Sequence, residues 1–246
     1  SALIHAATMV TAGVYLLCRL FPLVVLSPEG MAAIALIGIL SAFYAALCAL
    51  AQDEIKRVLA YSTLSQVGYM FLGVGAGTMS GAMFHLYTHA FFKSLLFLGA
   101  GCVILLTGEN NIQRMDRSAR RNPIVFATFL VGALSLAGAP LTSCFFSKDS
   151  ILLTVFSQGS AFFKLLWILG TLTAILTALY SFRLIYLVFW GKEKSSRDVP
   201  TVPFTMGVVL PVLAFLALFS GLLNIPAFFG GSERLRRFLG EVDLVN

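Results

Sequence analysis

The sequence predicts an all-α membrane protein, a polytopic bundle of about seven transmembrane helices. Of its 246 residues, 59% are hydrophobic and only 11% are charged, whereas soluble domains average roughly 45–50% and about 25%. The apolar residues gather into long runs separated by polar connections. Because one bilayer crossing needs about 20 apolar residues, a chain of this length has room for about seven crossings. This composition excludes an ordinary water-soluble globule.

Each apolar run is expected to form one span, in order along the chain. The runs cover residues 2–22, 31–51, 58–78, 81–106, 123–157, 165–190 and 204–226. The early connections are too short for a soluble domain, and two longer polar stretches follow at 108–122 and 191–203. We therefore expect one transmembrane domain over residues 1–226, and a charged tail over 227–246 that is too short to span.

The basic residues are interpreted as topology signals. The net charge of +6 and the isoelectric point near 9.3 could indicate nucleic-acid binding, but the basic residues lie in loops rather than on a water-facing surface. Alternating spans place most of them on one side, namely Lys56, Arg57, Arg114, Arg117, Arg120, Arg121, Lys192, Lys194 and Arg197. The positive-inside rule makes that side cytoplasmic, with the start of the chain there and its end opposite. Residues 114–121 could alternatively form a patch for lipid headgroups or a partner subunit.

The chain shows no sequence pattern for a cofactor, a metal or a cleaved leader. It opens inside an apolar run without an initiator Met, so we expect it to be part of a longer protein. The cysteines stand singly, without a C-x-x-C pair, which argues against a disulfide framework or a thiolate site; they are Cys18, Cys48, Cys102 and Cys144. Because phosphate-loop, flavin, haem and catalytic-triad patterns are also absent, we expect no redox centre or active site in this chain.

The fifth run predicts a broken helix. At about 35 residues it exceeds one straight crossing, and it contains Gly138 and Pro140 within the segment 136–143. A proline removes one backbone donor and clashes with the preceding turn. At membrane depth the freed carbonyls then need protein groups or water as partners. The pattern favours a discontinuous helix beside an ion site, as in many transporters, with an ordinary proline kink as the alternative.

The fourth run places ionisable residues where charge is costly. His85, His89 and Lys93 are spaced i, i+4, i+8, which predicts a polar stripe about 12 Å long on one helix face. A mid-span charge such as that of Lys93 costs at least about 2.5–3.5 kcal/mol, so it must face the bundle interior. Burial disfavours a charged amine and imidazoles exchange protons near neutral pH, so the three form a candidate proton wire. The alternatives are hydrogen-bonded packing histidines, or a zinc pair, against which the missing Glu of H-E-x-x-H argues.

A second charged group lies on the broken run. Lys148 and Asp149 are adjacent and point about 100° apart on a helix, so we expect them not to neutralise each other fully. If Lys148 shares a hydrated cavity with Lys93, protonating one lysine would push a proton off the other. Alternatively, the pair sits at a helix end in the headgroup region.

Three polar features give weaker signals. His5 lies near the chain start and is either interfacial or part of the relay. Arg183 is expected to be structural, either by snorkelling to the interface or by pairing with an acid. The polar segment 61–66 of the third run can hydrogen-bond between helices or hold water, and helix packing is the favoured interpretation.

Four ordered stretches, residues 5–15, 53–66, 84–93 and 145–152, carry a family resemblance. With them the chain resembles the antiporter-like subunits of NADH–quinone oxidoreductase (respiratory complex I), of the subunit L or mitochondrial chain 5 type. The resemblance extends over almost all of residues 1–226. It implies two inverted five-helix repeats, each with a broken helix and a lysine near the membrane midplane, joined into a hydrated axis for proton transfer. The first run would close the first repeat, the second to sixth runs would form the second repeat, and the seventh would be an additional helix.

The resemblance also implies roles for the ionisable residues. They are Lys93 as the central lysine, His85 and His89 as connecting histidines, Lys148 with Asp149 as the terminal group, and His5 as the lead from the first repeat. The acid and lysine of the first repeat would lie upstream of Ser1, so this chain would carry half of the machinery. Met115-Asp116-Arg117 departs from the Met-Gly-Gly that is frequent in the family, which puts local partner contacts in doubt.

The first functional hypothesis is a proton-translocating, multi-pass subunit of a redox-driven NADH–quinone oxidoreductase in a bacterial inner membrane. Other subunits would oxidise NADH and reduce quinone, and the partners would be those subunits and lipid, without nucleic acid. The alternatives are a subunit of a multi-subunit sodium/proton antiporter or of a membrane-bound hydrogenase, and a static scaffold that moves no ion. The mid-span Lys93 argues against the scaffold.

Overall fold

The computed structural model of the chain describes residues 2–191, 201–224 and 234–239. The expectations for Lys192, Lys194 and Arg197, and for most of the tail at 227–246, lie outside these residues. Within the described ranges, strand pairing is limited to one isolated bridge between Glu54 and Asn111. The predicted all-α fold is confirmed.

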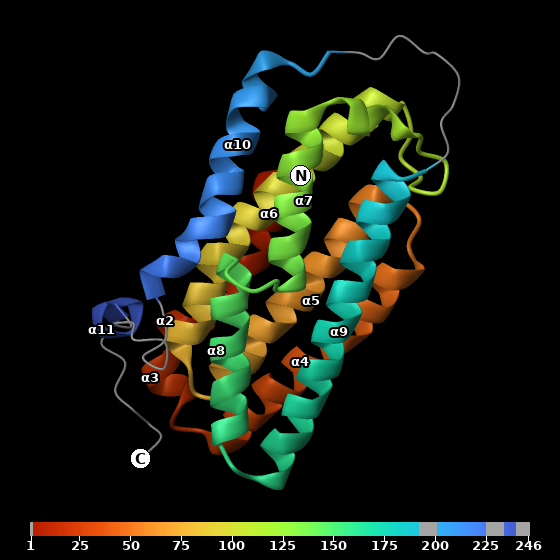
Figure 1. Ribbon diagram of the computed structural model, residues 1–246. Helices are drawn as coiled ribbons and strands as arrows, with labels where there is room; N and C mark the ends of the chain where they lie inside the picture. The colour runs from red at the N-terminus through yellow and green to blue at the C-terminus, as the bar shows by residue number, and fades with distance from the viewer. Residues whose placement is uncertain (1, 192–200, 225–233, 240–246) are drawn as a thin grey trace.

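The apolar runs form helices in the predicted order (Figure 1). The elements, with η for 3-10 turns, are α1 (Ala2–Ala6), η1 (Met9–Thr11), α2 (Ala12–Arg19), α3 (Phe21–Val24), α4 (Pro28–Ala51), α5 (Ile55–Gly75), α6 (Met79–Thr107), η2 (Arg117–Arg121), α7 (Pro123–Ala137), α8 (Ser143–Ser157), α9 (Ala161–Phe189), α10 (Phe204–Phe219), η3 (Ser220–Asn224) and α11 (Arg234–Leu239).

Five segments are long and apolar enough to cross a membrane. They are Ala2–Arg19, Pro28–Ala51, Met79–Thr107, Ala161–Phe189 and Phe204–Asn224. The two remaining runs of the expected seven differ for physical reasons. Helix α5 carries the polar segment 61–66 and is less apolar, and the fifth run is divided into α7 and α8, each of 15 residues.

Capping residues set the ends of the long helices. The side chains of Ser27 and Thr78 accept hydrogen bonds from the amides of Gly30 and Gly81, at 3.1 and 3.0 Å, at the starts of α4 and α6. Gly108 ends α6 in the left-handed conformation, with a φ of 71°. Helix α6 therefore extends over 29 residues and passes through the bundle from end to end.

Helices α5 and α6 occupy the interior, while α4 and α9 cover them with apolar outer faces (Figure 1). The α4–α5 pair packs backbone against backbone. A Cβ added at Gly68 would lie 2.5 Å from the carbonyl oxygen of Gly38, so only a residue without a side chain fits there. Such close approach through small residues is typical of helices packed within a membrane.

The fifth run is discontinuous, as Gly138 and Pro140 predict. Helix α7 ends where Gly138 adopts a φ of 77°, and the amide of Ala139 returns to the carbonyl of Leu134 at 3.0 Å. Helix α8 starts at Ser143, after a short irregular segment. The hydroxyls of Ser135 and Ser143, one on each side of the break, donate to the carbonyl of Ala217 on α10 at 3.3 and 2.6 Å. The seventh run, through α10, therefore holds the two halves of the broken helix together.

The first run is also interrupted, which the sequence analysis did not predict. Helix α1 ends at Ala6, and a 3-10 turn intervenes before α2. Threonine hydroxyls bond to the main chain across this stretch, from Thr8 to the Leu3 carbonyl and from Thr11 to the Ala7 carbonyl, both at 3.0 Å. The carbonyl of Ala6, at the end of α1, becomes available to a side chain from another helix.

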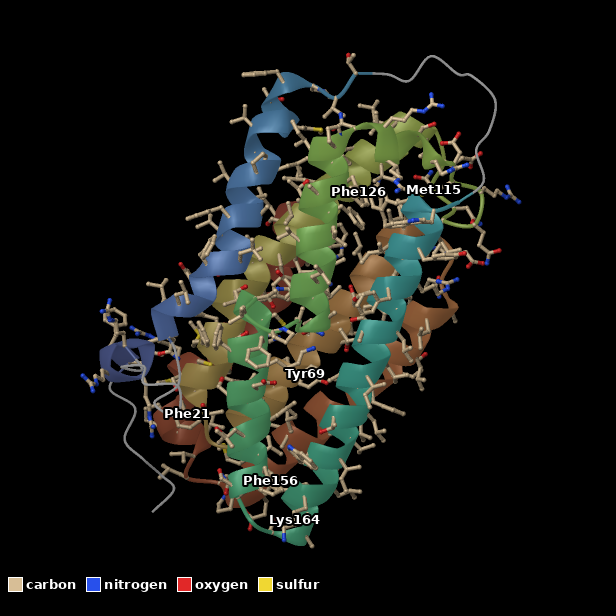
Figure 2. The ribbon with its side chains drawn as sticks, in the orientation of Figure 1. Phe21, Tyr69, Met115, Phe126, Phe156 and Lys164 are labelled. Atoms are coloured by element: carbon tan, nitrogen blue, oxygen red, sulfur yellow. The ribbon has the colours of Figure 1, made fainter. Side chains whose placement is uncertain are left out.

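The polar loops gather at one end of the bundle. The amide of Ile112 donates to the carbonyl of Asp53 at 2.7 Å, which joins the α4–α5 loop to the loop after α6. Figure 2 labels Met115 at this end and Lys164 at the other, with Tyr69 about midway between them. The arrangement agrees with alternating spans; which end faces the cytoplasm stays a prediction.

Candidate functional site

The buried row on α6 is the main concentration of ionisable side chains inside the bundle. His85, His89 and Lys93 are each completely buried. The imidazole ring centres of His85 and His89 lie 6.3 Å apart. The i, i+4, i+8 spacing thus places the three side chains on one face of α6, which faces the other helices. Each of the three side chains contacts a different partner.

His89 is bound by the interrupted first run. Its Nδ1 atom lies 2.8 Å from the carbonyl oxygen of Ala6, and its ring contacts Phe92 edge-on at 5.4 Å between ring centres. A carbonyl only accepts, so Nδ1 carries the hydrogen in this contact, and Nε2 is the acceptor in the neutral ring. His89 Nε2 meets no hydrogen-bond partner among the described residues, which leaves it free for a water molecule.

His85 is tied to the broken helix. Its Nδ1 atom lies 2.9 Å from the Oγ atom of Ser147 on α8. The same Ser147 Oγ lies 2.9 Å from the hydroxyl of Thr88. His85 Nε2 is buried without a partner in the part of the chain that the structure describes. Since Ser147 immediately precedes Lys148, one hydroxyl links the α6 row to the second lysine's segment.

Lys93 ends the row and is held by α5. Its Nζ atom donates to the Ser62 hydroxyl and, at 3.3 Å, to the carbonyl oxygen of Leu59. Both acceptors belong to neighbouring turns of one helix, so α5 fixes the position of the amine. The sequence interpretation favoured helix packing for the segment 61–66 and did not foresee this contact with Lys93.

Lys148 is the second buried lysine. It is 3% exposed, and its Nζ atom lies 5.1 Å from the centre of the Tyr69 ring on α5, a cation–π distance. No hydrogen-bond partner for this Nζ atom lies within the described ranges. Asp149 points to the exposed side of α8, so the two adjacent charges do not share a face, as their helix positions predict.

His5 and Arg183 have different surroundings. His5 stacks on Phe97, with ring centres 5.1 Å apart and planes 15° from parallel. Because Phe97 follows Lys93 by one turn of α6, His5 lies at the Lys93 end of the row. Arg183 pairs with an acid: it donates to Asp53 at 2.7 Å and to the carbonyl of Gln52 at 2.8 Å. Its role is that of an anchor between α9 and the α4–α5 loop.

Asp53 is the centre of this anchor. Gln113 also donates to its carboxylate, at 2.7 Å. The hydrogen bonds from Gln113 and Arg183 hold the pKa of Asp53 below its usual range. Three segments far apart in the sequence are therefore joined at the loop end of the bundle.

The buried contacts bring together a series of groups that can exchange protons. Direct contacts join Lys93 to Ser62 and His85 to Ser147, and the free ring nitrogens and the Lys148 amine are suited to bridging water. The described residues contain no group of three His, Cys, Asp or Glu side chains that could hold a metal ion. The position of Ser147 next to Lys148 is a signal that could have pointed to its part in the site. The Ala6 carbonyl gives no such signal, because every residue has a backbone carbonyl.

Comparisons with known proteins show the family of the chain. The family model described as the transmembrane region of NADH:quinone oxidoreductase and Mrp antiporter matches residues 1–177. The chain is 46% identical to NADH-quinone oxidoreductase subunit L of Escherichia coli (strain K12) over 233 residues, covering 94% of the chain and 37% of that protein. It is 43% identical to NADH-ubiquinone oxidoreductase chain 5 of Schizophyllum commune over 239 residues, covering 95% of the chain and 35% of that protein.

A solved structure is also similar. One chain of the Mrp complex from Dietzia sp. DQ12-45-1b matches 99% of this chain with a TM-score of 0.81 and 30% identity, and 27% of that chain is covered. The chain spans about a third of the length of the curated relatives it matches.

Proposed function

The chain belongs to the transmembrane family of NADH:quinone oxidoreductases and Mrp antiporters, and from this premise we propose that it carries protons within a larger membrane complex. The specific proposal is a subunit of the subunit L or chain 5 type in a redox-driven NADH–quinone oxidoreductase. The chain is an integral multi-pass membrane protein, and a bacterial inner membrane is the proposed location. Residues 1–226 would form its transmembrane domain and 227–246 its tail.

The observation that carries the proposal is the completely buried row of His85, His89 and Lys93 on α6. Three ionisable side chains inside a membrane bundle are costly, and a purely structural helix would have no use for them. Each has a hydrogen-bonding atom that contacts a different neighbouring helix. This distribution suits a relay, because a proton can enter and leave the row at different places.

We assign the roles along the line as follows. Lys93 is the central proton carrier, and the histidines pass protons by accepting at one ring nitrogen and donating from the other. Ser147 connects His85 to the segment of Lys148, which is the second carrier. Asp149, on the outer side of α8, would exchange protons with water or another subunit, and His5 would connect the row to the upstream part of the parent protein.

In this proposal the remaining chemistry belongs to other subunits. They would oxidise NADH and reduce quinone, and no cofactor or metal is assigned to this chain. The two buried lysines respond to each other by charge repulsion, so protonating one favours release from the other. Partners would be the neighbouring membrane subunits and lipid.

A second candidate function is a subunit of a multi-subunit sodium/proton antiporter, which the similarity to a chain of an Mrp complex favours. The test is transport by the purified parent complex in sealed liposomes, with NADH and quinone supplied and a pH dye inside. We expect NADH-driven proton movement that is unchanged when sodium is omitted. Movement that requires sodium, or a parent complex that lacks NADH-oxidising subunits, would favour the antiporter.

A further inference from the structure

A second group of buried polar side chains lies between α5 and α9, beside the row on α6. Gln66 on α5 and Tyr180 on α9 are almost completely buried. Both polar atoms of the Gln66 amide and the Tyr180 hydroxyl lack a hydrogen-bond partner within the described residues. An amide and a phenol rarely stay unbonded in a bundle interior, because losing their hydration without replacement is costly.

Three polar side chains lie near the Tyr180 hydroxyl. They are Thr177, Gln66 and Ser62, each within interaction range of this hydroxyl. Thr177 uses its own hydroxyl on the carbonyl of Thr173, at 2.8 Å. That leaves the Gln66 amide and the Tyr180 hydroxyl as neighbouring buried groups without a hydrogen-bond partner among the described residues, with Ser62 nearby.

Ser62 belongs to both groups. It accepts a hydrogen bond from Lys93 and donates to the carbonyl of Leu59 at 2.8 Å. A hydroxyl has two acceptor lone pairs and one donor that can rotate. Ser62 can therefore keep its contact with Lys93 while it turns its hydrogen towards the space near Gln66 and Tyr180.

A buried water site needs two to four polar partners, which these side chains supply. The Gln66 amide offers a donor and an acceptor, the Tyr180 hydroxyl offers both, and Ser62 completes the set. We propose that Ser62, Gln66 and Tyr180 form a buried water site that serves Lys93 as a side branch for proton exchange. This inference rests on the proposed function, in which Lys93 carries protons.

The transfer step is balanced within this group. The Lys93 ammonium gives one proton to Ser62 Oγ while the Ser62 hydroxyl hydrogen moves to the bound water, so Lys93 becomes a neutral amine and the water gains one proton. The water passes that proton on, and Ser62 keeps the same number of hydrogens. The reverse sequence loads Lys93.

The branch leads away from the histidines. Tyr180 lies three residues before Arg183, or about 4.5 Å along α9, and Arg183 is anchored to Asp53 at the loop end of the bundle. His85 leads instead to Ser147 and the broken helix. Ser62 thus connects Lys93 to the loop end, while His85, two helical turns away on α6, connects the row to α8. A carrier that loads and unloads by different routes requires two such directions.

The first test is a high-resolution electron cryomicroscopy map of the intact parent complex. We expect density for an ordered water within hydrogen-bond distance of the Gln66 amide and the Tyr180 hydroxyl. The second test is Tyr180→Phe in the same complex, which removes the hydroxyl and keeps the ring. We expect NADH-driven proton translocation to slow about tenfold or more, since a positioned proton-transfer group contributes roughly 10²–10⁴-fold.

Tyr186→Phe is the matched control, because Tyr186 lies on the same helix and is 64% exposed. Subunit content is measured on every sample, and Gln66→Met replaces the first variant if Tyr180→Phe does not assemble. Absence of the water density, or translocation in the assembled variant at the control rate, overturns the branch. If Lys93→Ala also translocates normally, the proposed function fails with it; if Lys93→Ala is inactive, only the branch is lost.

Discussion

The Nδ1 atom of His85 on α6 lies 2.9 Å from the hydroxyl oxygen of Ser147 on α8. This contact joins a continuous helix to the second half of a broken one, one residue before the buried Lys148. A break in a helix lets its second half take an angle that its first half does not impose. The contact thus depends on the irregular segment that Gly138 opens.

Ser147→Ala should interrupt the link between His85 and Lys148. The substitution removes only the hydroxyl and keeps the Cβ atom, so we expect the complex to assemble while NADH-driven proton translocation falls about tenfold or more. The measurement is the translocation rate in liposomes, normalised to subunit content. Ser157→Ala serves as the control, because Ser157 is exposed near the end of the same helix; equal rates for the two variants would contradict the assignment.

Gly138→Ala should destabilise the protein through its backbone alone. A Cβ at Gly138 meets no atom within 4 Å, but the residue has a φ of 77°, where a side chain costs about 1–2 kcal/mol. Thermal unfolding in detergent should show a lowered midpoint. Gly101→Ala is the matched control, since its Cβ also meets nothing within 4 Å and its φ is ordinary; there we expect a gain of up to about 1 kcal/mol. Equal shifts in the two variants would refute the argument.

Arg183→Lys should be more harmful than a snorkelling role implies. The guanidinium bonds the Asp53 carboxylate and the Gln52 carbonyl together, and an ammonium cannot reproduce that fork. We expect a lower unfolding midpoint in Arg183→Lys and no further loss when Asp53→Asn is added. Additive losses in the double variant would show that the two side chains act independently.

The Asp53 anchor also predicts a pH dependence. Its pKa is lowered in the folded protein by the bonds from Gln113 and Arg183. A lowered carboxyl pKa contributes stability above the unfolded value, about 3.9, and that stability is lost as the pH falls through the folded value. The difference in unfolding midpoint between the unaltered protein and Asp53→Asn should therefore stay constant from neutral pH down to about pH 5 and shrink below about pH 4. A difference that grows on acidification would have the wrong sign.

Local patterns predicted the parts of this structure that depend on local physics. The apolar runs predicted the helices, and Gly138 with Pro140 predicted the break in the fifth run. The i, i+4, i+8 spacing of His85, His89 and Lys93 predicted that these side chains share one buried helix face. Each of these follows from a few neighbouring residues and the low polarity of a membrane.

Contacts between distant segments could not be predicted in the same way. Arg183 and Asp53 are separated by 130 positions, so the sequence left both pairing and snorkelling open. Ser62 lies in a helix with several hydroxyl residues, and only the packing of α5 on α6 selects it for Lys93. The interruption after Ala6 escaped notice because threonines, without glycine and proline together, give a weak signal for a break.

The most direct test of the account is proton translocation per NADH oxidised by the assembled parent complex carrying Lys93→Ala or Lys93→Arg, with subunit content checked on the same samples. We expect both complexes to assemble and both to lose most translocation. Alanine removes the carrier, and an arginine guanidinium keeps its proton at every physiological pH and cannot release it. If both variants assemble and translocate the normal number of protons per NADH, then Lys93 carries no protons and His85, His89 and Lys93 form a structural stripe.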